Sequence, residues 1–384
     1  MRRRWPYRTK TTYYDSRQSV VGEARDNGVD FHRRMDNPVT RSAPQPRACD
    51  PGLAGKVLFL ARPQSYAEAT CRVDTIETHM SWVFLTDRHA WKLKKPVRQS
   101  YLDFSTEAAR RHYCAEEVRL NRRLTQGVYL ETVPLTADAG GNLRLGPGGT
   151  VVDWLVKMRR LPAERMLDRM IRGGLVRTDD VRNVVGALCR FYRECAPAAM
   201  GQREYRVRFA AGIAENLLEL STREFALPIA MIEPTCARQR AFLERAAALF
   251  DERARGGHIV EAHGDLRPEH ICLERQPQII DCLEFSLDFR LLDTADELGF
   301  LALECERLGA AWMRRSIFET YTELSGDAPP DALAHFYQSF RACMRAKISI
   351  WHLKEPSLTD PSKWTTQARD YLGLAASHIA QCRS

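Results

Sequence analysis

Two stretches decide the fold of this chain: HGDLRPEH at 263–270 and IID at 279–281. They place two carboxylates, Asp265 and Asp281, at the ends of two short apolar segments that a tight polar loop separates. Either half alone has a plain explanation, because Asp after Gly is common in turns and an Ile-Ile-Asp ending fits any buried strand that runs into a loop. The two halves at this spacing, with Pro268 stiffening the loop, form a much more specific pattern.

The segment resembles the catalytic loop of the aminoglycoside phosphotransferase family, usually written H-G-D-x-x-x-x-N and then I-D. The match holds at His263, Gly264, Asp265 and Asp281, and it departs at His270, where the family normally has Asn. In kinases of this fold one Asp orients the hydroxyl that attacks the γ-phosphate, and a second Asp holds the Mg²⁺ that bridges the phosphates. The resemblance therefore implies that Asp265 is catalytic, that Asp281 is a metal ligand and that His263 supports the loop.

His270 stands where the resemblance expects a neutral carbonyl oxygen. Mg²⁺ prefers oxygen ligands, and imidazole is a poorer ligand for it. We predict His270 as a second metal-site residue, and hydrogen bonding to a phosphate or contact with Asp265 are alternatives. If the substitution impairs the site, the protein is a non-catalytic nucleotide-binding pseudokinase or a scaffold protein, which is the leading rival interpretation.

A β-hairpin with a four-residue loop is predicted at 82–94. On its second strand Trp91 and Leu93 face one side, and Lys92 and Lys94 face the other. Two lysines on one face of a strand are unremarkable by themselves, since they can simply be solvated.

A helix is predicted from Ser105, as N-cap, to about Leu124. Its apolar face includes Leu120, and Glu117 falls on that same face. A carboxylate on a core-facing stripe is costly unless a cation pairs with it. The preceding strand supplies two candidate cations.

Kinases of this fold use a strand Lys to hold the α- and β-phosphates and a helix Glu to hold that Lys. Lys92 and Glu117 fit these roles, and Ala90 two residues earlier matches the Ala-x-Lys form of the strand. Lys94 has the same facing and is a close rival for the phosphate-binding role. The resemblance also places Met158, near the end of a strand predicted at 151–158, at the edge of the adenine.

The resemblance covers the chain from about 60 to 355. It implies an α+β, protein-kinase-like fold in two lobes: a small N-lobe sheet with one main helix at 53–160, and a larger, mostly helical C-lobe at 161–384 with the acceptor pocket. Similar bacterial proteins are labelled phosphotransferase-family or gluconate-kinase-like, and some are fused to a P-loop domain. The sequence contains no G-x-x-x-x-G-K-[ST] motif, so that domain is expected to be absent.

Composition indicates a globular protein of the cytoplasm. The 384 residues are 44% hydrophobic and 28% charged, and no stretch approaches the roughly 20 apolar residues of a membrane span or reads as a secretory signal. The 11 Cys show no C-x-x-C pairs, which argues against a zinc site and a disulfide framework.

The formal charge of +8 does not predict nucleic-acid binding. Residues 1–50 hold 11 Lys or Arg and 6 Asp or Glu, so most of the excess lies in a segment (1–52) that reads as a disordered basic tail. We therefore predict ATP and Mg²⁺ as cofactors and a small polar molecule with a hydroxyl group as acceptor. The sequence indicates neither the identity of the acceptor nor the oligomeric state.

A helix predicted at 336–353 carries one further candidate. Lys347 lies on one face with Phe340 and Met344. It either pairs with a structural carboxylate or enters the acceptor pocket of the C-lobe.

Overall fold

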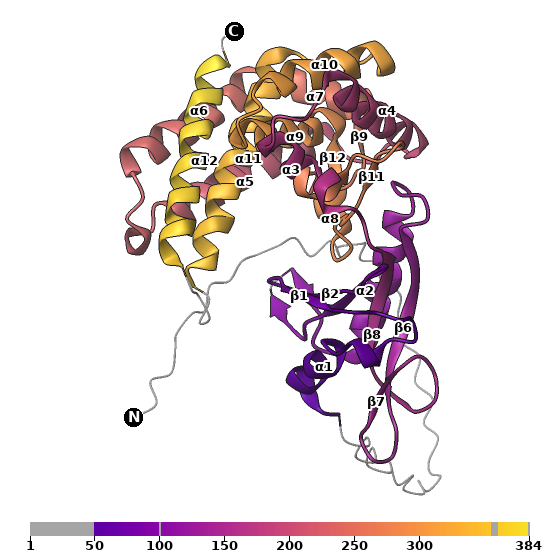
Figure 1. The fold of residues 1–384 in the computed structure, drawn as a ribbon. Coiled ribbons are helices and arrows are strands. Elements are labelled where there is room, and N and C mark those ends of the chain that lie inside the picture. Colours follow the sequence, from indigo (N-terminus) through magenta and orange to yellow (C-terminus); the bar gives the residue numbers. More distant parts are fainter. Residues whose placement is uncertain (1–49, 100, 355–359, 383–384) are drawn as a thin grey trace, which may run out of the picture. The chain divides into compact units, whose positions relative to one another are not determined.

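The first part of the structure is an antiparallel sheet of six strands in the order β1-β2-β3-β8-β6-β7 (Figure 1). The structure is a computed structural model that describes residues 50–99, 101–354 and 360–382, all within one compact unit. The predicted basic tail lies, up to residue 49, outside the described residues. The six strands are β1 (Asp74–Glu77), β2 (Ser81–Leu85), β3 (His89–Lys94), β6 (Tyr129–Ala137), β7 (Leu143–Leu145) and β8 (Thr150–Arg159), and β4 (Arg98–Gln99) pairs separately with β5 (Leu102–Asp103).

The predicted hairpin at 82–94 is confirmed as the antiparallel pair β2–β3. Trp91 and Leu93 are buried in an apolar cluster with Leu60 of α1 (Gly52–Leu60). The two lysines of β3 lie on the opposite face, as their alternation predicts. The sheet is therefore covered by α1 on one face and by the following helix on the other.

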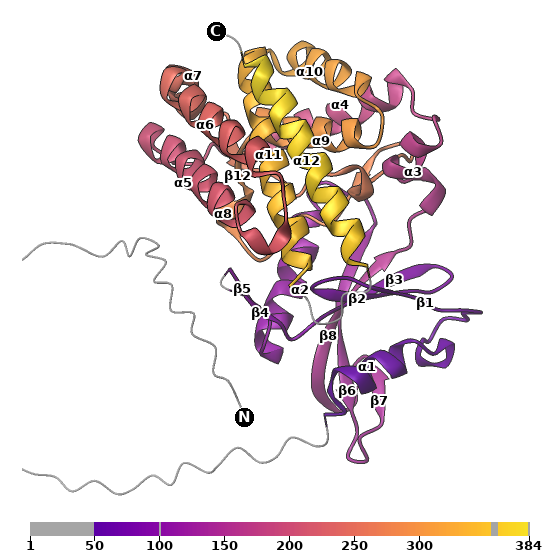
Figure 2. The same ribbon diagram turned by 90° about the vertical axis from the view of Figure 1, so that its left-hand side faces the viewer.

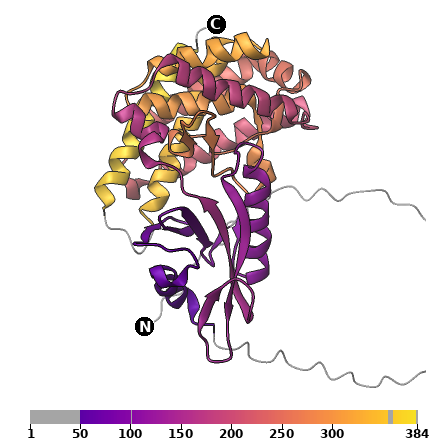
Figure 3. The same ribbon diagram turned by 45° about the vertical axis from the view of Figure 1, so that its right-hand side comes forward.

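That second helix, α2 (Glu107–Asn121), lies alongside the long strands β6 and β8 (Figure 3). Its N-cap is Thr106 and not the predicted Ser105. The Thr106 hydroxyl accepts a hydrogen bond from the Ala109 amide at 3.1 Å, the spacing that an N-cap requires, whereas Ser105 bonds to Asp103. Helix α2 also ends three residues before the predicted Leu124, because the backbone tightens into a turn there.

The remainder is mostly helical, as predicted, and Figure 2 shows α11 and α12 packed side by side. Its longer helices are α3 (Leu167–Arg172), α4 (Thr178–Glu194), α5 (Gln202–Leu220), α6 (Ile229–Arg245), α7 (Ala247–Arg255), α9 (Thr294–Arg307), α10 (Trp312–Ser325), α11 (Asp331–His352) and α12 (Pro361–Gln381). Short elements lie between them: β9 (Ile259–Glu261), the 3₁₀ turn Pro268–His270, β10 (Ile271–Cys272), β11 (Gln278–Ile279), α8 (Leu287–Arg290) and β12 (Leu291–Asp293). Strand β12, which follows the two motif segments, pairs antiparallel with β9, which precedes them.

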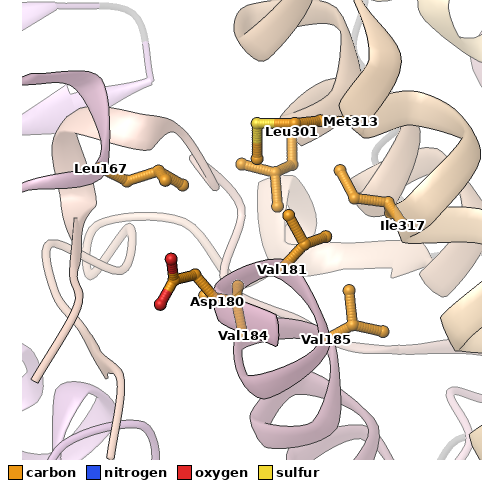
Figure 4. Close-up of a pocket in the computed structure, with 8 residues that line it drawn as sticks. All are labelled: Leu167, Asp180, Val181, Val184, Val185, Leu301, Met313 and Ile317. Carbon is orange, nitrogen blue, oxygen red and sulfur yellow. The ribbon is translucent and has the colours of Figure 1, made fainter. Parts of the chain in front are cut away.

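One of two large apolar cores in the helical part holds the loops of interest in place. Ala262, Leu266, Ile271 and Ile279, which flank the two predicted aspartates, are fully buried in it. Figure 4 shows a gap in this core between α3, α4, α9 and α10, lined mainly by aliphatic side chains. The gap leaves no room for a water molecule, so we interpret it as core packing.

The predicted α+β fold class is confirmed: a small antiparallel sheet with one main helix is followed by a larger, mostly helical part. The domain boundaries at 52 and 160 stay predictions. Among the described residues, no helix combines the length and the apolar character that a membrane crossing needs.

Candidate active site

The loop that carries Asp265 is anchored by a buried carboxylate. Glu297, on α9, accepts hydrogen bonds from the amides of His263 at 2.9 Å and Gly264 at 2.7 Å. Gly264 has φ of +90°, and a Cβ there would lie 3.0 Å from Leu283 Cδ1, so the turn needs glycine. The loop is thus held from the helical core and leaves the Asp265 side chain partly exposed.

His263 links this loop to the one that carries Asp281. Its Nε2 donates to the carbonyl oxygen of Ile280 at 2.8 Å, and its Nδ1 accepts from the Asp265 amide at 3.2 Å. The acceptor role of Nδ1 requires a neutral ring, and burial together with neighbouring His270 lowers the pKa of His263 to about 4. His263 thereby occupies the supporting position that the resemblance implies.

Asp265, Arg267 and His270 form a contact group at the end of the loop. The Arg267 guanidinium donates to Asp265 Oδ2 through Nε at 3.0 Å, and its Nη2 lies 2.9 Å from the same oxygen. His270 Nδ1 donates to the backbone oxygen of Asp265 at 2.9 Å. Burial works to raise the pKa of the Asp265 carboxyl, but the positive surroundings of the group, above all the Arg267 guanidinium, outweigh it and lower the pKa below its ordinary value.

Asp281 has an unusual backbone that two residues of the sheet part hold in place. Its φ is +63°, a left-handed conformation that is uncommon outside glycine but accessible to Asp and Asn. The Asp281 amide donates to the Tyr129 hydroxyl at 3.1 Å, and the next amide, of Cys282, donates to Asn121 Oδ1 at 2.9 Å. These bonds fix the position of the carboxylate, whose side chain is 42% exposed. Its Oδ1 lies 2.5 Å from Lys92 Nζ, and its Oδ2 lies 3.5 Å from His270 Nε2.

Five charged side chains form a continuous chain of alternating sign: Asp281, Lys92, Glu117, Lys94 and Glu284. Lys92 Nζ lies 2.8 Å from Glu117 Oε1, and Lys94 Nζ lies 2.6 Å from Glu117 Oε2. At the far end Lys94 also contacts Glu284. Three carboxylates against two ammonium groups leave an excess negative charge, and the partly exposed end of the chain is Asp281.

The ion pairs keep both Lys92 and Glu117 in their charged forms. Burial works to lower the pKa of Lys92, but Asp281 and Glu117 outweigh it and raise the pKa well above the ordinary value. Burial likewise works to raise the pKa of Glu117, and the two lysines lower it instead. The sequence predicted that a buried Glu117 requires a cation as partner, and the structure gives it two, Lys92 and Lys94.

The two lysines differ in what they can reach. The Lys92 side chain is 14% exposed and touches Asp281, whereas the Lys94 side chain is 0% exposed and lies between two carboxylates. Only Lys92 is therefore placed to contact a ligand without a rearrangement of the buried pairs.

Met158 lies on β8 directly opposite Ala90 of β3. Both belong to an apolar cluster with Val156 and Ile280, and Val156 is the cross-strand partner of Lys92. An apolar cluster thus lies next to the charged chain, and contact of Met158 with an adenine ring stays a prediction.

The structure brings all seven predicted site residues into this region. It also shows further residues in contact with them that the sequence interpretation missed. Arg267 was visible as a charge within the first motif segment, and Glu284 lies three residues after the end of the second. Tyr129 and Asn121 carried no local signal, because their contacts depend on the fold.

The donors fit a magnesium ion only in part. Asp281 Oδ2 is free of the lysine contact, and His270 Nε2 lies 3.5 Å from it. Across the described part of the chain, no three His, Cys, Asp or Glu side chains are grouped to hold a metal by themselves. Mg²⁺ usually takes one or two protein carboxylates and completes its shell with phosphate oxygens and water, so the residues fit a metal that arrives with a nucleotide.

Lys347 has structural partners. Its Nζ lies 3.1 Å from Glu215 Oε2 and 5.1 Å from the centre of the Trp351 ring. These contacts match the structural alternative stated for this residue.

Comparison with known proteins gave relatives of similar sequence. No protein-family model matches the chain. Proteins of Mycobacterium bovis and Mycobacterium tuberculosis, both described as uncharacterized, are 32% identical over 281 residues, which is 72% of this chain and 54% of theirs. The chain therefore spans about half the length of the curated relatives that it matches.

Several solved structures are similar at low sequence identity. A choline/ethanolamine kinase family protein from Mesorhizobium loti has a TM-score of 0.49 at 16% identity, over 86% of this chain and 98% of that one. A glucosamine kinase has 0.44 at 15%, over 83% and 79%. An aminoglycoside phosphotransferase from Streptomyces rimosus has 0.41 at 17%, over 76% and 98%. At these values the likeness does not bear on activity.

Proposed function

We propose that this protein is an ATP-dependent phosphotransferase that transfers the γ-phosphate to a hydroxyl group of a small polar molecule. The observation that supports this most is the direct contact of Lys92 with both Glu117 and Asp281, while His270 lies between Asp281 and the backbone of Asp265. These contacts support the proposal because phosphoryl transfer needs a phosphate-binding lysine, a carboxylate that holds it, a metal-ligand carboxylate and a base close together, and we assign these roles to Lys92, Glu117, Asp281 and Asp265.

In this proposal Lys92 binds the α- and β-phosphates, and Glu117 holds its ammonium group in place. Met158 and its apolar neighbours bind the adenine. Asp281 and His270 would hold Mg²⁺, which supplies positive charge to the phosphate oxygens when it is bound. His270 Nδ1 donates to a backbone oxygen, so Nε2 carries the lone pair that faces the Asp281 side.

Asp265 acts as the base. It orients the acceptor hydroxyl and takes its proton as that oxygen attacks the γ-phosphorus. Because the pKa of Asp265 is lowered, the carboxylate is ionised and able to accept a hydrogen bond at neutral pH.

The proposal is tested by incubating the purified protein with Mg²⁺ and ATP against a library of hydroxyl compounds and measuring ADP release. We expect one chemical class to stimulate ADP release and the product to carry the phosphate. Tight nucleotide binding without transfer to any compound would favour the alternative, a non-catalytic nucleotide-binding pseudokinase.

A further inference from the structure

Arg345, on α11, is an arginine that is held on one side and unpaired on the other. Its Nε donates to the Tyr371 hydroxyl at 3.3 Å and lies 3.2 Å from Glu304 Oε1. In the part of the chain that the structure describes, its two terminal nitrogens donate no hydrogen bond. The side chain is 13% exposed, and these nitrogens are not enclosed in the interior. A largely buried arginine therefore presents two unpaired donors to solvent.

Arg341, one turn earlier on the same helix, shows how a structural arginine is paired. Its Nε and Nη2 donate to the two carboxylate oxygens of Asp296 at 2.8 and 2.6 Å. Both side chains are buried, so this pair is complete without a ligand. Arg345 has no pair of this kind, since Glu304 approaches it most closely at Nε and accepts no hydrogen bond from its terminal nitrogens.

The partners of Arg345 fix its direction. Glu304 and Tyr371 come from α9 and α12, which both pack against α11 (Figure 2). Glu304 is fully buried and already occupied: its Oε1 accepts from the Tyr371 hydroxyl at 2.6 Å, and its Oε2 accepts from Arg307 Nε at 3.1 Å. The Arg345 guanidinium also lies 5.6 Å from the centre of the Tyr371 ring. Because the guanidinium is held in advance, less entropy is lost when it binds a ligand.

Arg345 lies close to the catalytic loop. Arg307, which shares Glu304 with it, lies 3.7 Å from Glu269 in the 3₁₀ turn of that loop. Burial works to raise the pKa of the Asp265 carboxyl, and the charges that oppose this effect include Arg345 besides the groups of the loop itself. A guanidinium from α11 therefore borders the space next to the proposed base.

We propose that Arg345 binds an anionic group, a carboxylate or a phosphate ester, on the acceptor whose hydroxyl faces Asp265. This inference rests on the proposed function and names the chemical class of its acceptor, a hydroxyl compound with an acidic group. A guanidinium pairs with either anion through two parallel hydrogen bonds, which the two unpaired terminal nitrogens supply. The contact positions the acceptor hydroxyl and leaves the chemistry of transfer to the groups described above.

One buried carboxylate oxygen indicates a competing class of acceptor. Glu269 Oε2 has no hydrogen-bond partner within the described residues, and an amino group on the acceptor could pair with it. That oxygen is closed to solvent, however, and Arg307 already lies 3.7 Å from the other oxygen of the same carboxylate. The terminal nitrogens of Arg345 are open to solvent, so the anionic class is favoured.

The experiment measures acceptor kinetics with matched sets of short polyols. Each polyol is offered unmodified, with a carboxylate, with a phosphate ester and with an amino group. ADP release at saturating Mg²⁺–ATP gives kcat/KM for every form. We expect the carboxylate or the phosphate form to exceed the neutral and amino forms by about tenfold or more, and the better of the two identifies the anion.

Variants then test the residue itself. In Arg345→Gln the KM for the preferred anionic acceptor should rise by about ten- to hundredfold, and the affinity for Mg²⁺–ATP should stay within about twofold, which also shows that the variant folds. Arg345→Lys keeps the charge and should recover part of the loss. Arg206→Gln, which removes an arginine paired with Asp251 at 2.8 Å between α5 and α7, is the matched control and should change neither quantity.

The outcomes separate this inference from the proposed function. If the neutral or the amino form is the best acceptor, or if Arg345→Gln leaves the KM for the anionic acceptor unchanged, the role of Arg345 is overturned and the proposed function stands. An equal loss of affinity for ATP and acceptor in Arg345→Gln would also overturn it, because the arginine would then act on the nucleotide or the fold. If no form of any compound stimulates ADP release by the wild type, the proposed function fails and this inference fails with it.

Discussion

The two sides of the candidate site are built differently. On the sheet side, Lys92 and Lys94 lie in a chain of buried charges in which each ammonium group contacts two carboxylates. On the loop side, Asp265 and Arg267 are each over a fifth exposed and meet through a single carboxylate oxygen. The first arrangement favours rigidity and the second permits exchange of partners, so substitutions on the two sides should have different consequences.

Asp265→Asn should have the largest effect, and it should fall on turnover alone. The substitution removes the base but keeps the shape of the side chain, so we expect transfer to fall by about 10²- to 10⁴-fold. Steady-state rates with an identified acceptor measure this, and the affinity for Mg²⁺–ATP serves as the control. Unchanged turnover would remove Asp265 from the mechanism.

Lys94→Met should have the largest effect on stability. It leaves Glu117 and Glu284 short of a partner in a buried setting, and breaking a buried ion pair costs about 3–5 kcal/mol. Chemical denaturation measures the loss. Lys157→Met is the matched control, because Lys157 is on neighbouring β8 and pairs with an exposed Glu131 at 3.5 Å, and it should change stability little. A loss no larger than in this control would contradict the idea of a rigid sheet side.

Lys92→Met should show that Lys92 and Lys94 have different roles. Glu117 keeps Lys94 as its partner, and Asp281 is partly exposed, so stability should change much less than in Lys94→Met. The affinity for ATP should fall by about tenfold or more, because a charge-assisted contact with the phosphates is lost. If Lys94→Met, where it folds, weakens ATP binding and Lys92→Met does not, the assignment of the phosphate-binding lysine is reversed.

The connection between the two loops should show in the pH dependence of stability. The pKa of His263 is lowered from 6.5 to about 4, so its neutral form stabilises the folded state above pH 6.5, and this contribution is lost as the pH falls toward 4. We expect the free energy of unfolding of the wild type to fall by roughly 3 kcal/mol from this group over that range. In His263→Asn the corresponding slope should be absent. Parallel pH profiles for the two proteins would show that His263 does not titrate in this way.

The sequence predicted much of the fold because its local signals agree with the structure. The alternation at 90–94 predicted which side chains of β3 face α2, and the apolar face of α2 predicted that Glu117 is buried. Choosing between Ser105 and Thr106 as N-cap required the backbone geometry, since both residues can cap a helix.

The site was predictable where its residues lie within motifs and not where they meet through the fold. Lys92, Asp265 and Asp281 lie in recognisable segments, but the choice between Lys92 and Lys94 depended on exposure. Tyr129, whose hydroxyl accepts from the Asp281 amide, lies 152 residues away in the sequence. A contact of that separation leaves no pattern in a single sequence.

The most direct test asks whether Asp281 binds the Mg²⁺ that accompanies ATP. Calorimetry would measure the affinity of the wild type and of Asp281→Asn for ATP, with and without Mg²⁺. Asn tolerates the left-handed backbone at this position, so the substitution changes the charge without adding strain. We predict that Mg²⁺ strengthens ATP binding to the wild type and that Asp281→Asn removes this dependence. Equal ATP affinity with and without Mg²⁺ in the wild type, or an unaltered Mg²⁺ effect in the variant, would contradict the proposed phosphotransferase site.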